Sequence, residues 1–287
     1  MITKEMPKLT QYSKASGCGC KADPNALHEI LKGLREQCIL FPSLLRDASS
    51  ADDAAVYKLN DDTALLLTTD FFAPAIDNPY DFGRVAAANA LSDIYAMGGK
   101  PFLALAVMAW PLEKIGAESA RETLKGGAQV CEKAGVALAG GHTIEGAEPL
   151  FGLCVAGTSP LAHLKTNGGA KHGDILYLTK PVGSGILMSA YRRRLLTSNS
   201  EYAYLIDHLT RLNSAGAFFG EFSYVHALTD VTGFGLIGHL LEMCKASQLC
   251  AHLNFESIPL MHGVENFITQ FVYPDITFRN WKFVEQH

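Results

Sequence analysis

Hydrophobic residues recur along the chain with two different periods, and these periods predict a mixture of helices and strands. Helical spacing of apolar residues predicts helices over residues 27–34, 82–97, 119–134, 184–196, 203–219 and 235–246. Short apolar runs bounded by turn residues predict strands over residues 54–57, 64–68, 102–110, 136–139, 150–157, 175–179, 225–229 and 250–255. Strands and helices alternate, with some hairpin-like neighbours, which indicates a mixed α/β protein.

Two interruptions of this pattern divide the chain. Residues 1–23 have no hydrophobic periodicity, and we expect them to form a mobile arm rich in glycine and cysteine. Around residues 162–173 the pattern gives way to Lys, Asn, Gly and His, which marks a domain junction. We therefore expect an N-terminal domain over residues 24–161 and a C-terminal domain over residues 174–287.

Composition and charge exclude several classes of protein. Lys and Arg number 24 against 29 Asp and Glu, so no net positive charge favours nucleic acid or anionic lipid. A membrane-spanning helix needs roughly 20 consecutive apolar residues, and the longest apolar run, over residues 102–110, is much shorter. The lysine-bearing first residues do not resemble a signal peptide, and the seven cysteines are an odd number. We expect a cytoplasmic protein with reduced thiols that binds neither nucleic acid nor membranes.

Four acidic residues stand beside or within the predicted elements in positions where ligands meet a scaffold. Asp53 precedes a strand, Asp70 follows one, Asp93 lies within the alanine-rich helix, and Asp230 follows a strand. Carboxylates that converge repel one another unless a hard cation such as Mg²⁺ holds them, and Mg²⁺ in proteins commonly carries substrate phosphates. Convergence would therefore predict a Mg²⁺–nucleotide site, whereas helix capping is an equal alternative for Asp230.

Two glycine-rich turns could offer backbone amides to phosphate. One is predicted at residues 140–143 after a strand, and the other at residues 232–235 before a helix. Neither matches the P-loop or the dinucleotide fingerprint, so a nucleotide would be bound by another architecture.

The arm carries the run Gly17-Cys18-Gly19-Cys20-Lys21, which combines two thiols with a cation. A neighbouring lysine favours the thiolate, so this run suits nucleophilic or chalcogen chemistry. Half of a zinc site and incidental cysteines on an exposed tail are the alternatives.

Taken together, these motifs resemble the selenophosphate synthetase family, the selenide, water dikinases. The resemblance runs from about residue 9 to residue 280, and its motifs are Gly17–Lys21, Asp52–Tyr57, Thr68–Phe72, Asn89–Pro101, Leu138–His142 and Leu228–Gly235. It implies the reaction of ATP, selenide and water to selenophosphate, AMP and phosphate. It also implies the fold of aminoimidazole ribonucleotide synthetase, in which an α/β N-terminal domain, dimerising through its sheet, precedes an α+β C-terminal domain.

The resemblance also implies roles for individual residues. Cys18 and Lys21 match the family's catalytic positions, and Lys21 would also contact ATP. The implied Mg²⁺ ligands are Asp53, Asp93 and Asp230, and the implied nucleotide-site acids are Asp70 and Asp93. The run Gly141, His142 and Thr143 would contact ATP from the partner subunit of a homodimer.

The chain departs from the family pattern in three places. These are residues 47–51, residues 271–280 and the end at His287, beyond which family members continue, so we expect an incomplete C-terminal domain. Two alternatives remain open: another ATP-dependent synthetase or kinase of the same fold, and a truncated, catalytically weak paralogue that binds nucleotide. The cysteine–lysine arm argues against the first alternative, because another enzyme of this fold has no need for it. The retained catalytic motifs argue against the second.

Overall fold

The computed structural model describes residues 6–13, 29–31, 39–47 and 52–286. Most of the expected arm over residues 1–23 and most of the expected helix over residues 27–34 lie outside these ranges. Within the described part of the chain, no helix is both long and apolar enough to cross a membrane.

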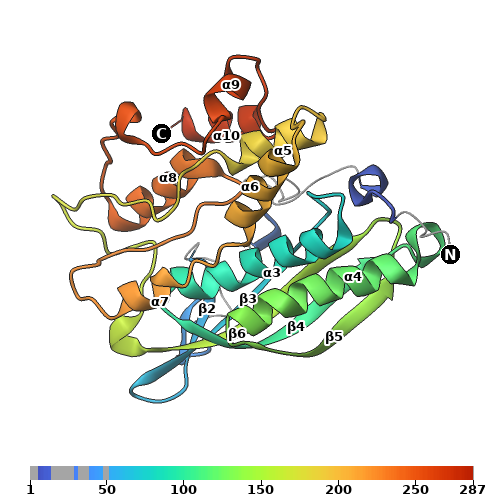
Figure 1. Cartoon of the computed structure of the whole chain (residues 1–287). Helices are drawn as coiled ribbons and strands as arrows, with labels where there is room; N and C mark the ends of the chain where they lie inside the picture. Colours follow the sequence, from blue (N-terminus) through green and yellow to red (C-terminus); the bar gives the residue numbers. More distant parts are fainter. Residues whose placement is uncertain (1–5, 14–28, 32–38, 48–51, 287) are drawn as a thin grey trace.

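One six-stranded sheet organises the first half of the molecule (Figure 1). Its strands lie in the order β1-β2-β3-β6-β4-β5, and every neighbouring pair is antiparallel except β4 and β5, which are parallel and joined by a helix. The strand bounds are β1 Leu44–Arg46, β2 Ala55–Lys58, β3 Thr63–Phe72, β4 Lys100–Trp110, β5 Ala137–Glu145 and β6 Leu150–Pro160. The five strands predicted in this half of the chain are present, with ends that differ by a few residues.

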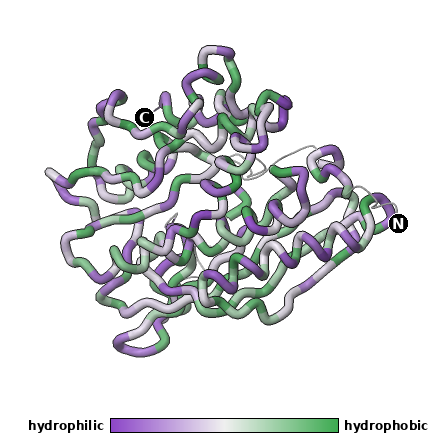
Figure 2. Tube along the Cα trace, viewed as in Figure 1, coloured by the Kyte–Doolittle hydropathy of each residue, from purple (hydrophilic) through white to green (hydrophobic). Residues whose placement is uncertain are grey.

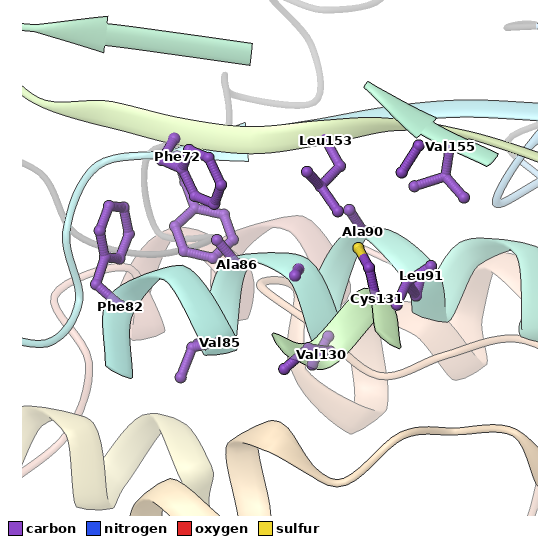
Figure 3. Close-up of a cluster of buried hydrophobic side chains, with 14 of the residues drawn as sticks. Phe72, Phe82, Val85, Ala86, Ala90, Leu91, Val130, Cys131, Leu153 and Val155 are labelled. Atoms are coloured by element: carbon purple, nitrogen blue, oxygen red, sulfur yellow. The ribbon is translucent and has the colours of Figure 1, made fainter. Parts of the chain in front are cut away.

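Helices α3 (Pro79–Ala96) and α4 (Leu112–Lys133) cover one face of this sheet (Figure 1). Phe72 points from β3 towards Phe82 and Ala86 of α3, and Leu153 and Val155 point from β6 towards the part of α3 that carries Ala90; these residues form part of the core (Figure 3). Hydrophobic and hydrophilic positions alternate along α4, as expected for a helix with one face in solvent (Figure 2). Small residues let the two helices approach closely: a Cβ on Gly126 would lie 1.9 Å from the Tyr80 carbonyl oxygen.

The opposite face of the sheet carries exposed hydrophobic side chains. Leu67 and Phe71 of β3 are 45% and 48% exposed, and Leu105 of β4 is 43% exposed. Cys154 of β6 pairs with both Thr69 of β3 and Leu105 of β4, so these strands present one continuous surface.

The second half of the described chain is helical. Its helices are α5 Ser184–Arg192, α6 Asn199–Thr210, α7 Ala215–Gly220, α8 Gly235–Ser247, α9 Val264–Ile268 and α10 Thr277–Val284. Short 3₁₀ turns at Leu161–His163 and Phe255–Ser257 accompany them, and a further one, Leu9–Tyr12, lies near the start of the chain. The helix predicted over residues 203–219 is wrong as a single element. It is two helices, because the chain is extended at Arg211 and α7 packs on α3, where a Cβ on Gly216 would lie 2.2 Å from the Tyr95 carbonyl oxygen.

The three strands predicted in this half are wrong for the same physical reason. A strand needs a neighbour for its backbone hydrogen bonds, and residues 175–179, 225–229 and 250–255 belong to none of the six strands. The one isolated bridge in the described part of this half joins Val182 and Leu260. Ile175 and Tyr177 are 73% and 85% exposed, so this apolar segment is not a buried strand.

We predict that Gly126→Ala destabilises the protein by about 3 kcal/mol or more, because the added methyl group meets backbone and α3 and α4 must separate. Chemical denaturation followed by circular dichroism measures this. Gly185→Ala in α5 is the matched control, because its nearest contact is the Pro274 ring carbon at 3.0 Å. Equal stability of the two variants would contradict the close packing of α3 and α4.

Candidate active site

Three of the expected acids converge on one point. Asp53 precedes β2, Asp93 lies in α3, and Asp230 lies in the segment before α8. One carboxylate oxygen from each lies within 4.8 Å of the other two. Residues 177 positions apart in the sequence (230 − 53) thus form one acidic cluster, and they are the three acids that the family resemblance implies as Mg²⁺ ligands.

The face of β3 that meets α3 positions Asp93. Alternate residues of β3 point to the core, and after Ala64 and Leu66 this alternation places Thr68 and Asp70 on the same face. The Thr68 hydroxyl donates a 2.6 Å hydrogen bond to Asp93 Oδ2. One turn earlier in α3, the Asn89 amide donates to Asp70 Oδ2 at 2.5 Å. The prediction that Asn89 and Asp93 share one helix face is confirmed, whereas the expectation that Asp70 follows its strand is wrong, because β3 continues to Phe72.

Asp230 is buried, and a residue of α3 binds its side chain. The Ser92 hydroxyl donates a 2.5 Å hydrogen bond to Asp230 Oδ2. Helix α8 begins after Phe234, and no side chain caps it. The capping alternative for Asp230 is therefore wrong, and its carboxylate serves the acidic cluster.

Burial and mutual repulsion dominate the electrostatics of the cluster. Burial raises the pKa of Asp53 well above its ordinary value, and the negative charge of Asp230 raises it further. Burial likewise raises the pKa of Asp93, and the negative charges of Asp230, Asp70 and Asp53, in that order of size, raise it further. Among the residues that the structure describes, no salt bridge to a cation involves any of the three.

The cluster fits a hard divalent cation. Asp53 Oδ2 is buried and has no hydrogen-bond partner among the residues that the structure describes. An orphaned carboxylate oxygen is costly to bury unless a cation or a donor meets it. Three carboxylates offer only oxygen ligands, which is the donor set that Mg²⁺ prefers.

The other expected site residues lie elsewhere or outside the described ranges. The turn predicted at residues 140–143 is wrong: Gly141, His142 and Thr143 lie within strand β5, and the register against β4 shifts beside Gly141. A Cβ on Gly141 would lie 2.0 Å from the Ala106 carbonyl oxygen, so glycine permits this close pairing. Two strands separate β5 from β3, a spacing of about 14 Å, so these residues do not join the cluster. Cys18 and Lys21 lie outside the described residues.

The predicted turn at residues 232–235 is present. The Gly235 amide donates to the Thr232 carbonyl at 3.0 Å, and Gly235 adopts a φ of 71°. The Asn280 side-chain amide donates to the Gly233 carbonyl at 2.8 Å. The turn therefore follows Asp230 in a fixed conformation at the start of α8.

Sequence reasoning missed several polar residues around the cluster. Thr68 lies on the core-facing side of β3, as every second residue of the strand does, and this alternation could have identified it as a residue near the site. Lys180 gives no sequence signal: its ammonium group donates to the Arg211 carbonyl. Burial and the charge of Arg211 lower the pKa of Lys180 to about 8, while the charge of Asp230 opposes this shift. Lys180 is thus a cation in the electrostatic neighbourhood of the cluster.

We predict that Mg²⁺ stabilises the protein more at pH 8 than at pH 6. A carboxyl with a raised folded-state pKa holds its proton more tightly when folded, so the free energy of unfolding falls as pH rises from about 4 through that raised pKa. Mg²⁺ offsets the repulsion that this deprotonation creates. Thermal unfolding with and without Mg²⁺ at both pH values measures the difference.

Asp93→Asn removes one of the repelling charges. We expect the metal-free variant to melt roughly 2–6 °C higher than the parent at pH 8 and to lose most of the Mg²⁺ effect. Asp62→Asn, in the exposed turn before β3, is the matched control and should keep the parent's response. A parent protein whose melting temperature ignores Mg²⁺ at both pH values would contradict the metal site.

Comparisons with known proteins agree with this fold. Residues 51–159 match the family described as AIR synthase related protein, N-terminal domain, and residues 171–272 match its C-terminal domain. The selenide, water dikinase of Shewanella baltica strain OS155 is 48% identical over 285 residues, which cover 99% of this chain and 80% of the relative. That of Shewanella sp. strain MR-7 is 48% identical over 282 residues, covering 98% of this chain and 79% of the relative.

Solved structures share the fold at much lower identity. Thiamine monophosphate kinase from Aquifex aeolicus has a TM-score of 0.69 and 19% identity, covering 89% of this chain and 83% of its own. The hydrogenase maturation protein HypE in complex with ATP has a TM-score of 0.62 and 19% identity, covering 93% of this chain and 78% of its own. From the shared domains and the 48% identity over almost its whole length, we conclude that this chain belongs to the selenide, water dikinase family, within the AIR synthase-related fold.

Proposed function

We propose that this chain synthesises selenophosphate from ATP, selenide and water, releasing AMP and phosphate. The observation that carries the proposal is the cluster of Asp53, Asp93 and Asp230, whose oxygens lie within 4.8 Å of one another. Phosphoryl transfer depends mainly on positioning and on neutralising charge. The selenide, water dikinase relatives at 48% identity supply the reaction type.

The acids have two different roles in this proposal. Asp53, Asp93 and Asp230 hold Mg²⁺, which when bound neutralises charge on the phosphate oxygens. Asp70 lies on the same face of β3 as Thr68 and accepts a hydrogen bond from Asn89, and its proposed role is to contact the nucleotide.

The arm supplies the chemistry that the cluster lacks. Lys21 would offset developing charge on the transferred phosphoryl group, and Cys18 would bind selenide or shield it from water and oxidation. The match of Gly17–Lys21 to the family motif supports these roles.

We propose further that a second copy of the chain covers the open face of the sheet. Leu67, Phe71 and Leu105 expose large apolar side chains on this face, and gathered apolar side chains are typical of interfaces. Gly141, His142 and Thr143 lie on the exposed edge strand β5, far from the acids of their own chain. A partner subunit would allow them to contact ATP bound to the other copy.

We predict that anaerobic incubation with Mg²⁺, ATP and selenide yields AMP, phosphate and selenophosphate, read by phosphorus NMR. Asp93→Asn should lower the rate by at least about 100-fold, because it removes one ligand of the Mg²⁺ that neutralises the phosphate charge. Asp62→Asn should retain the parent's rate. Nucleotide binding without selenide-dependent AMP would instead support the catalytically weak alternative. Transfer to a different acceptor would support another synthetase or kinase of this fold.

Cys18→Ser tests the arm separately from the metal site. We expect it to bind Mg²⁺ and ATP as the parent does and to lose most selenide-dependent AMP formation. Full activity in this variant would remove the proposed role of Cys18.

We predict that the pair of substitutions Leu67→Asp and Leu105→Asp converts a dimer to a monomer, because each buries a charge in the proposed interface. Light scattering after size-exclusion chromatography measures the mass. Leu124→Asp on α4, a leucine that is 40% exposed outside this face, is the matched control. A monomeric parent protein would contradict the dimer.

A further inference from the structure

Ser92 connects the acidic cluster to a loop that the proposed reaction does not use. Its side chain is buried in α3, immediately before Asp93. Its hydroxyl donates to Asp230 Oδ2 at 2.5 Å and accepts a 2.8 Å hydrogen bond from the side-chain amide of Asn213. Asn213 lies between α6 and α7, 121 residues away in the sequence.

Helical serines in the described part of this molecule bind partners of different kinds, and Ser247 of α8 also reaches a distant segment, at the Asn167 carbonyl. Ser119 of α4 and Ser189 of α5 donate to carbonyls four residues earlier in their own helices. Such bonds use the serine hydrogen within its own helix, although Ser119 also accepts a 3.1 Å hydrogen bond from Trp110 Nε1. The Ser92 hydroxyl bonds instead across to a carboxylate from a different part of the chain.

The direction of the two hydrogen bonds follows from counting protons. A hydroxyl has one hydrogen to donate, whereas an ionised carboxylate only accepts. The Asn213 amide donates to the serine oxygen, so the serine hydrogen remains available to Asp230. Asn213 therefore fixes the orientation in which Ser92 meets the carboxylate.

The loop that carries Asn213 is held on both sides. The Lys180 ammonium group donates to the Arg211 carbonyl, two residues before Asn213. Three residues after it, Gly216 packs against the Tyr95 backbone of α3. Asn213 thus reaches Ser92 from a fixed position.

We propose that Asn213 and Ser92 form a relay that holds the Asp230 carboxylate in its metal-binding orientation. The inference rests on the proposed metal site and assigns positioning roles to two residues outside it. Ser92 occupies one oxygen of Asp230 and leaves the other for the cation. Hydrogen-bonded partners of metal ligands typically account for 10–100-fold in metal affinity.

Binding of Mn²⁺ to the full chain, measured by isothermal titration calorimetry with a non-hydrolysable ATP analogue, tests the relay without turnover. We expect Ser92→Ala to weaken Mn²⁺ binding by roughly 10–100-fold. Asn213→Asp should weaken it comparably, because a carboxylate at this position cannot donate and would draw the serine hydrogen away from Asp230. Thermal unfolding checks that each variant is folded, and the half-buried Asn213 makes its variant the safer of the two.

Two matched controls separate the relay from general effects. Ser189→Ala removes a helical hydroxyl that bonds only within α5, and Asn60→Asp adds a charge while keeping both hydrogen bonds that the Asn60 oxygen accepts. Both should bind Mn²⁺ within about twofold of the parent.

The double variant Ser92→Ala/Asn213→Ala tests the coupling. In a relay, Asn213 has nothing to orient once Ser92 is lost, so the double variant should match Ser92→Ala alone. Additive losses, or parent-like Mn²⁺ binding in folded Ser92→Ala and Asn213→Asp, would overturn the relay while leaving the metal site intact. A parent chain that binds no Mn²⁺ would instead overturn the metal site on which the relay rests.

Discussion

The burial of three like charges beside one another constrains the rest of this structure. Asp53, Asp93 and Asp230 bring their oxygens within 4.8 Å, and burial raises the pKa of both Asp53 and Asp93. Such a cluster opposes folding unless the elements carrying it are held together by stronger interactions. The tight glycine contacts between α3 and α4, and the aromatic and aliphatic core between α3 and the sheet, provide that hold. The acids then remain in place for a cation to relieve their repulsion.

The sequence predicted the sheet half of the fold well because its signals there are local. The alanine-rich run ending at Gly98 and Gly99 defines α3, and continuous apolar runs define the central strands. The helical half was harder to predict. Residues 175–179 and 250–255 have the composition of strands, but a strand also requires a neighbour, and composition does not reveal one. The break between α6 and α7 likewise depends on the docking of Gly216 against Tyr95, a tertiary contact.

The acids of the candidate site could be predicted because their positions were unusual for surface residues. Asp93 within an alanine-rich helix is hard to explain as an ordinary surface residue, and the family motifs single out Asp53 and Asp230. The residues that orient them could not be predicted in the same way. Ser92 and Asn213 are ordinary residue types, and only the folded chain brings them together. The turn predicted at residues 140–143 was wrong for a related reason. A glycine pair usually indicates a turn, but here Gly141 permits close pairing of β5 with Ala106 of β4.

Helix α3 both packs tightly against α4 and positions the polar residues of the site. One side of it uses Gly83 to approach α4, where a Cβ would lie 1.8 Å from the Thr123 carbonyl oxygen. Towards β3 and the segment of Asp230, the same helix presents Asn89, Ser92 and Asp93. Because a helix moves largely as a rigid body, a displacement of α3 by loosened packing would shift all three polar side chains together. Core substitutions far from the acids should therefore impair metal binding before they unfold the protein, since the cluster tolerates less displacement than the hydrophobic core does.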